Sequence, residues 1–287
     1  MNAMISGERI LARSLSSGAI PDKFGNSWQY HSRSDRHSKI ACWGVLFDLL
    51  LSCPLLRRHT AHGTIGFGIN HEMTDFVTGR RKNLDLVICL PRSDAKAPRQ
   101  VAFGDLIEQY DIQLAAPELD AFNSLPMLLR RPVGEVLVAL EAKACMTAHT
   151  KAAPRLFDEL SSAAQCINGS APSAIAVGHV LVNTSDHFVS SDRNRRHRTA
   201  TNRDDSRDPQ PISWEKALGT ARRLTVRGYA TDRGFDAVGV TMLKGVNDGN
   251  PFVVPSVPPR LPSNDPLSYE SMIHRVSGIY DTRFQNR

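Results

Sequence analysis

Hydrophobic and polar positions along the chain predict alternating helices and strands. A broad apolar face over residues 35–51 predicts a helix capped by Ser34 or Asp35, with Pro54 helping to end it. Apolar runs bounded by turn residues predict buried strands over 64–69, 84–90, 135–142, 174–183 and 235–243. Amphipathic stretches predict further helices over 103–110, 155–167, 214–229 and 267–280. This order predicts an α/β fold with one central mixed sheet flanked by helices.

The same pattern divides the chain into four parts. Residues 1–33 are weakly patterned, which indicates an N-terminal arm or a loosely packed lead-in. Residues 34–184 contain the predicted core, and residues 212–287 add a C-terminal helix–strand extension to the same domain. Residues 185–211 are crowded with Arg, Asp, Ser and Asn and have almost no apolar side chains. Such a segment cannot offset its ordering entropy by burial, so we expect a flexible polar insertion.

Composition favours a globular, cytoplasmic protein. Hydrophobic residues make up 41% and charged residues 22% of the 287 positions, which is ordinary for such a protein. The five cysteines contain no CxxC pair and four of them lie in apolar or helical runs, so we expect reduced core cysteines. No apolar run approaches the ~18 residues of a membrane span, and the N-terminus lacks the apolar core of a signal peptide.

The charge balance favours polyanionic partners. The chain has a net charge of +6, with 27 arginines and 8 lysines. Arginine binds phosphate in a bidentate manner, so this ratio is compatible with nucleic acid as a partner. A high arginine content is equally expected from a genome rich in G and C.

The residues that carry candidate chemistry lie at the end of the strand EVLVALEAK, residues 135–143. Glu141 and Lys143 are two positions apart, so both project from the same face of a strand. This pair suits metal-dependent cleavage of a phosphodiester bond. The carboxylate can hold a divalent ion, and the lysine beside it can orient the attacking water or help to deprotonate it. Asp85 opens the strand LDLVICL and supplies a second carboxylate if the two strands are neighbours. These residues predict a Mg²⁺ site formed by Asp85, Glu141 and the carbonyl of Ala142, in which Mn²⁺ can substitute.

Two alternatives compete with this interpretation. Asp94-Ala95-Lys96 repeats the acidic-x-Lys pattern closer to Asp85, but it lies beyond Pro91 without a strand to hold it. Glu141 and Lys143 could also form a plain ion pair at an exposed strand end, which contributes only about 0–1 kcal/mol. The preceding strand and the following helix favour Glu141 and Lys143 as functional residues.

Several other polar residues are weaker candidates. Glu72 and Asp75 precede the Asp85 strand and could add carboxylates near the metal, although a solvated turn is the more common explanation. Lys151 and Arg155 begin the next helix, where backbone phosphate could bind. Asp48 interrupts the apolar face of the first helix and is expected on the helix surface. Another candidate for gripping nucleic acid is the basic run 80–82, which could equally be a polar hairpin tip.

Asp85 in NLDLVIC and Glu141 with Lys143 in VLVALEAK, followed by a helix and a strand, resemble the PD-(D/E)xK nuclease superfamily. The resemblance covers residues 35–185, about half of the chain. Leu84 stands in place of the namesake proline, and residues 91–132 would form an insertion between the two motif strands. The resemblance implies a restriction-endonuclease-like core in which Asp85, Glu141 and Lys143 are catalytic.

The sequence therefore predicts a Mg²⁺-dependent endonuclease of the restriction or phage-defence type that cuts double-stranded DNA. Cutting both strands of a duplex is most simply done by a homodimer or higher homo-oligomer. The alternatives are a nuclease of the same fold acting on RNA or branched DNA, and a nucleic-acid-binding protein without catalysis.

Overall fold

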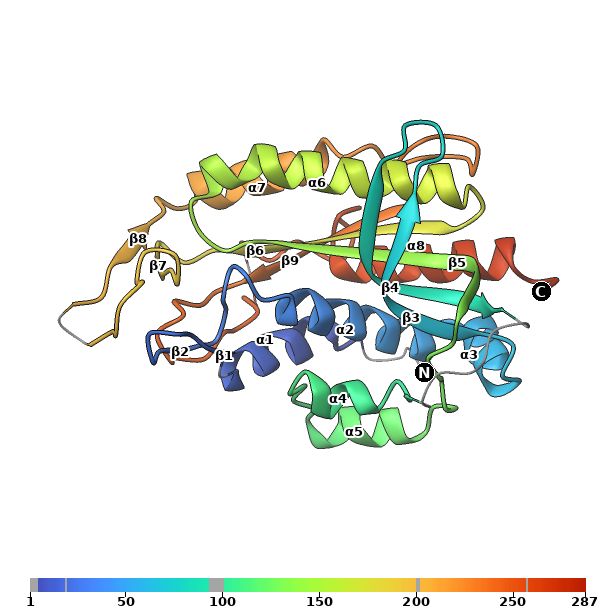
Figure 1. The fold of residues 1–287 in the computed structure, drawn as a ribbon, viewed down its shortest axis with the longest axis horizontal. Helices are drawn as coiled ribbons and strands as arrows, with labels where there is room; N and C mark the ends of the chain where they lie inside the picture. Colours follow the sequence, from blue (N-terminus) through green and yellow to red (C-terminus); the bar gives the residue numbers. More distant parts are fainter. Residues whose placement is uncertain (1–4, 19, 93–100, 200–201, 257) are drawn as a thin grey trace.

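A five-stranded mixed sheet forms the middle layer of the protein, with helices on both faces (Figure 1). The computed structural model describes residues 5–287 except 19, 93–100, 200–201 and 257. In spatial order the strands are β3 (Gly66–Thr74), β4 (Arg81–Pro91), β5 (Val133–Cys145), β6 (Ile175–Asn183) and β9 (Ala237–Leu243). The pairs β3–β4 and β4–β5 are antiparallel, whereas β6 and β9 continue parallel to β5. The predicted α/β class and mixed central sheet are confirmed.

Helices bury the central strands from both sides. The helices α6 (His149–Ser170) and α7 (Ile212–Arg222) cover one face, and α2 (Arg36–Ser52) and α8 (Tyr269–Arg283) cover the other (Figure 1). Every residue of β6 and β9 is therefore buried, which explains why these strands are continuous apolar runs rather than alternating patterns. The core is divided accordingly into two hydrophobic clusters, one on each side of the sheet.

The segment between β4 and β5 folds into two short helices, α4 (Asp105–Gln109) and α5 (Ala116–Asn123). Phe103 stacks on Trp43 of α2 with ring centroids 4.9 Å apart, so this segment is attached to the core by aromatic packing. Helix α3 (Pro54–Ala61) follows α2 directly, and β1 (Ile20–Pro21) pairs with β2 (Ser27–Trp28). The sequence pattern predicted the helix near α4 but neither α3 nor α5.

The prediction of a loosely packed N-terminal arm is wrong. Residues Gly7–Ser17 form helix α1, in which Ile10, Leu11 and Leu15 are at most 1% exposed. These side chains join the hydrophobic cluster that contains α2 and α8. The sequence pattern did not predict this helix because its apolar face is narrow. The apolar side chains are buried only where α1 packs against α2.

The sequence predicted Asp48 on the surface of α2. This prediction is wrong, because Asp48 lies inside the protein. Its carboxylate is fully buried and accepts hydrogen bonds from the Ser6 and Gly7 N–H groups, at 2.9 and 2.7 Å. The Tyr269 hydroxyl of α8 donates a third hydrogen bond to it at 2.8 Å. The first N–H groups of α1 thus donate to a carboxylate from another helix. The hydrogen bonds of Asp48 join α1, α2 and α8.

The polar segment 185–211 contains the short paired strands β7 (His187–Val189) and β8 (Asp205–Arg207). Its Asn194 is 1% exposed and its side-chain amide donates to two main-chain carbonyls of the same segment. Asp208 reaches the start of α6 and accepts hydrogen bonds from Thr147 Oγ1 at 2.8 Å and from the Ala148 N–H at 3.2 Å. This cap lets α6 begin at His149, ahead of the helix predicted over 155–167. The flexibility expected for the segment stays a prediction.

All five cysteines are buried and free of disulfide bonds, as predicted. Among the described residues, no single helix is long and apolar enough to cross a membrane. The bent pair α2 and α3 reaches that length and composition together, with an angle of 96° between the two helices.

We predict that Leu11→Ala lowers the free energy of unfolding by about 3 kcal/mol, because it removes a fully buried side chain between α1 and α2. Urea unfolding measures this loss. Leu119→Ala on α5 is the matched control, since Leu119 is 45% exposed and its loss should cost less than about 1 kcal/mol. Equal effects of the two substitutions would mean that α1 does not belong to the core.

Candidate active site

Asp85 and Glu141 lie side by side on neighbouring strands. The antiparallel register of β4 and β5 pairs Leu86 with Leu140, which adjoin Asp85 and Glu141 in the chain. The Ala142 N–H donates to Asp85 Oδ2 at 3.0 Å. Both main-chain groups of a strand residue face the same neighbouring strand, so the Ala142 carbonyl is directed to this side as well. The structure thus brings together the three residues that the sequence assigned to a metal site.

Helix α2 holds the Asp85 carboxylate from the opposite side. Lys39 Nζ and Ser38 Oγ donate to Asp85 Oδ1 at 2.8 and 2.9 Å, and Lys39 also donates to the side chain of Asn70 on β3. The Lys39 side chain is only 3% exposed. Burial opposes its charge, but the neighbouring Asp85 raises the pKa of Lys39 above its ordinary value. Sequence reasoning missed Lys39, because only the packing of α2 against β4 shows that this lysine is internal.

Glu141 is a buried carboxylate whose hydrogen bonding is incomplete. It is 2% exposed, its Oε1 lies 2.9 Å from Lys143 Nζ, and its buried Oε2 has no hydrogen-bond partner. Burial raises the pKa of Glu141, the negative charge of Asp85 raises it further, and Lys143 acts in the opposite direction. A native protein rarely leaves a buried carboxylate oxygen unpaired, so this atom marks a place that a cation would stabilise.

Lys143 bridges two carboxylates at the floor of a cavity. Its ammonium group lies 2.9 Å from Glu141 Oε1 and 3.4 Å from Oε2 of Glu159 on α6. Burial disfavours the charged lysine, but Glu141, Asp85 and Glu159 together raise its pKa. Lys143 is therefore a fixed cation, which suits it to holding an anionic substrate or a water molecule better than to removing a proton.

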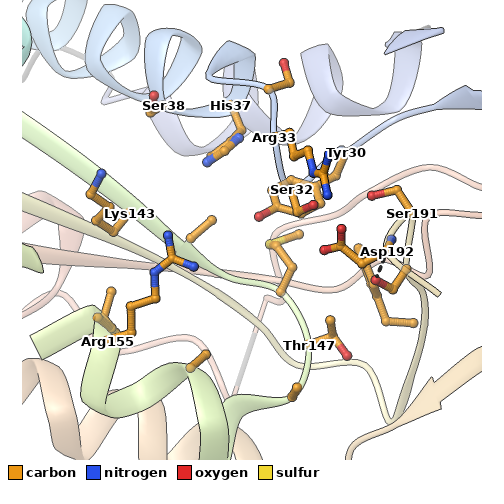
Figure 2. A pocket seen from close by; sticks show the side chains of 18 of the residues that line it. Tyr30, Ser32, Arg33, His37, Ser38, Lys143, Thr147, Arg155, Ser191 and Asp192 are labelled. Atoms are coloured by element: carbon orange, nitrogen blue, oxygen red, sulfur yellow. Dashed lines mark hydrogen bonds between the residues drawn. The ribbon is translucent and has the colours of Figure 1, made fainter. Parts of the chain in front are cut away.

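The cavity next to Lys143 has a volume of about 660 Å³ and is lined from three directions. Figure 2 shows Lys143 of β5 and Arg155 of α6 directed into the same space, with His37 and Arg33 across from them and Ser191 and Asp192 on the third side. The third wall belongs to the polar segment 185–211. Glu141 lies beneath this surface and does not line the cavity itself.

Both residues predicted to bind phosphate line this cavity. Lys151 is exposed, and Arg155 is 82% exposed while it forms a 2.6 Å ion pair with Glu159 Oε1. Arg33 and Arg193 add further positive charge to the lining. The half-buried His37 is neutral at pH 7, because partial removal from water lowers its pKa to about 4. Asp35, Asp85, Glu159 and Asp192 also line the cavity, so its five cationic side chains face four carboxylates.

The other acidic candidates lie elsewhere. Glu72 is on β3 and pairs with Arg81 at 3.6 Å, while Asp75 binds the turn between β3 and β4 and Gln165 of α6. Neither of them lines the cavity among the described residues, so the prediction that they add carboxylates near the metal is not supported. The rival pair Asp94 and Lys96 lies outside the described residues.

The residues present fit a small divalent ion through oxygen ligands. No group of three or more His, Cys, Asp or Glu side chains that could hold a metal occurs in the described part of the chain. The site instead offers two carboxylates and a main-chain carbonyl. An ionised carboxylate has about four acceptor positions, of which Asp85 uses three for Lys39, Ser38 and Ala142. One position on Asp85 and the unpaired Glu141 Oε2 remain, which is a ligand set typical of Mg²⁺.

Comparisons of the chain with known protein families, with characterised proteins and with solved structures found no match.

We predict that Lys39→Met lowers the free energy of unfolding by about 3 kcal/mol, because it leaves Asp85 buried beside Glu141 without a neutralising charge. Added Mg²⁺ should recover part of this loss. Urea unfolding with and without Mg²⁺ measures both effects. The exposed Lys244 serves as the control, and Lys244→Met should change neither quantity. A Lys39→Met protein as stable as its parent would show that Asp85 does not need the ion pair.

Proposed function

We propose that this protein is a Mg²⁺-dependent endonuclease that hydrolyses phosphodiester bonds in DNA, of the restriction or phage-defence type. The observation that carries the proposal is the pair of buried carboxylates on neighbouring strands, with Lys143 two residues after Glu141 in the lining of a cavity that Lys151 and Arg155 also line. The elements α2, β3, β4, β5, α6 and β6 occur in the order that the sequence predicted, with α3 after α2 and with α4 and α5 between β4 and β5. This order supports the resemblance to the PD-(D/E)xK superfamily and a restriction-endonuclease-like core.

In this proposal Mg²⁺, for which Mn²⁺ can substitute, would be held by Asp85, Glu141 and the Ala142 carbonyl. When bound, the ion supplies positive charge that stabilises the transition state of phosphodiester hydrolysis. Lys143 is kept charged by its two carboxylate neighbours and holds the attacking water or a phosphate oxygen. Lys39 and Ser38 fix the orientation of Asp85. Lys151 and Arg155 bind the backbone phosphate next to the cleaved bond.

One observation favours the alternative of a nucleic-acid-binding protein without catalysis. Lys39 already neutralises Asp85 at 2.8 Å, so half of the proposed metal site is balanced by the chain's own charge. A binding protein would keep Lys151 and Arg155 in the cavity and would shift DNA in a gel without cutting it in Mg²⁺. A nuclease of the same fold that prefers RNA or branched DNA would be recognised with a panel of substrates.

Double-stranded DNA is the proposed partner, and a homodimer is the simplest assembly that places two active sites on the two strands. Strand β9 is buried along its whole length within one chain. It is therefore unsuitable as a contact between chains. The exposed outer side of α8, around His274 and Gly278, remains open to such a contact.

We predict that Glu141→Ala and Lys143→Ala each reduce Mg²⁺-dependent plasmid cleavage by at least about a hundredfold. Circular dichroism should show an unchanged fold, because neither substitution removes an apolar core contact. Single-turnover cleavage with and without Mg²⁺ is the measurement. Full activity of either variant would contradict the assignment. The paired substitutions Asp94→Ala and Lys96→Ala form the control, and loss of cleavage there would identify that motif as the active one.

We predict that Lys151→Ala with Arg155→Ala weakens DNA binding and reduces the slope of log affinity against log salt by about 0.9 for each lost phosphate contact. Binding is measured by fluorescence anisotropy over a series of salt concentrations. Arg57→Ala with Arg58→Ala is the control, because these exposed arginines lie on α3 and do not line the cavity. An equal change of slope in both double variants would show that the cavity has no special role in binding.

A further inference from the structure

The turn between β3 and β4 exposes two large apolar side chains at its tip. Phe76 is 76% exposed and Val77 is 81% exposed. Among the large hydrophobic side chains that the described residues expose, these two are the only pair adjacent in the sequence. Figure 1 shows the turn projecting beyond α6 at the edge of the molecule. Single exposed apolar residues are common on protein surfaces, whereas a projecting pair needs an explanation.

The turn is held in place by hydrogen bonds. Asp75 accepts from the Val77 N–H at 3.1 Å, from Thr78 Oγ1 at 2.6 Å and from Gln165 Nε2 of α6 at 2.9 Å. The bond from Thr78 contributes most to lowering the pKa of Asp75, so the carboxylate stays ionised in this role. Cys166 Sγ donates to the Arg80 carbonyl at 3.4 Å. Because α6 fixes the tip, little conformational entropy is lost when the tip binds a partner.

Basic side chains follow the apolar pair directly. Arg80 and Arg81 are exposed, and Lys82 is half-buried. Two acidic residues lie near them, but Glu72 forms only a 3.6 Å pair with Arg81, and Asp75 is occupied within the turn. The tip therefore presents apolar surface beside guanidinium groups. That combination fits nucleic acid, whose bases accept apolar wedges and whose phosphates bind arginine.

The turn is connected rigidly to the candidate active site, because β4 runs without interruption from Arg81 to Asp85. Four strand residues span about 13 Å. Successive phosphates of one DNA strand lie about 3.4 Å apart along the helix axis. A duplex cleaved at Asp85 would therefore reach the turn within roughly four to six base pairs of the cut.

We propose that the β3–β4 turn is a wedge that contacts duplex DNA beside the cleavage site. Phe76 and Val77 press against bases, and Arg80 and Arg81 bind the adjoining phosphates. This inference rests on the proposed nuclease function and adds a second contact to it, which sets where the duplex lies relative to Asp85.

The test measures binding of a fluorescent 30-base-pair duplex to protein inactivated by Glu141→Gln. The double substitution Phe76→Ser with Val77→Ser should weaken binding at least about tenfold and leave the salt slope unchanged, because apolar contacts release no counterions. Arg80→Ala with Arg81→Ala should weaken binding and reduce the slope by about 1.8, the sum for two phosphate contacts. Met127→Ser is the control, since Met127 is 72% exposed at another place in the fold. A fluorescent base analogue placed four to six pairs from the cut should brighten on binding, and only when the tip is intact.

Three outcomes would overturn the wedge. The first is unchanged affinity of the Phe76→Ser, Val77→Ser protein. The second is an effect of this variant on self-association, measured by light scattering, in place of an effect on DNA binding, because the tip would then be a protein interface. The third is an unmodified protein that neither binds nor cuts nucleic acid, which would reject the proposed function as well. Cleavage by the unmodified protein together with an unaffected tip variant would reject the wedge alone.

Discussion

The carboxylate of Asp85 joins the three elements on which the site is built. It accepts hydrogen bonds from Lys39 and Ser38 at the start of α2 and from the main chain of β5, while its own backbone belongs to β4. Charges can be buried in this way only when nearly every donor and acceptor is paired, since desolvation otherwise exceeds the Coulombic gain. The position of α2 against the sheet is therefore fixed by the same interaction that fixes the candidate metal ligand.

The hydrogen bonds around Glu141 are less complete than those around Asp85. Lys143 lies between Glu141 and Glu159, and Arg155 pairs with Glu159 from the solvent side. Glu141 Oε2 is left unpaired, and burial beside Asp85 raises the pKa of this carboxyl group. Folding alone gives no reason to keep a second carboxylate there. Local violations of good pairing are more frequent at functional sites, and the proposed metal ion would supply the missing partner of Glu141.

Segments far apart in the sequence complete the cavity. Asp208 of the polar segment caps α6, so that Lys151 and Arg155 stand on the first two turns of a helix fixed beside β5. Ser191 and Asp192 of the same segment form one wall of the cavity (Figure 2). The segment has few apolar residues, of which Phe188 and Val189 are buried, and Asp208 attaches it to the start of α6 by hydrogen bonds. The polar segment 185–211 therefore has a structural role, because it caps α6 and forms a wall of the cavity.

The sequence by itself determined the elements whose apolar pattern is local. The strands around Asp85, Glu141 and residues 174–183 were predicted within a few residues, because strands covered on both faces are continuous apolar runs. The shared face of Glu141 and Lys143 also followed from sequence, since residues two apart on a strand share a face. The place of Asp85 beside them depended on the pairing of β4 with β5, which the tertiary structure decided. Tertiary structure alone decided the partners of these residues. Lys39, Glu159 and Asp208 come from separate helices and loops, and the burial that makes each charge important depends on what packs against it. Tertiary structure also decided the burial of α1 and Asp48. The sequence cannot show whether a narrow apolar face or a single aspartate is covered by a neighbouring helix.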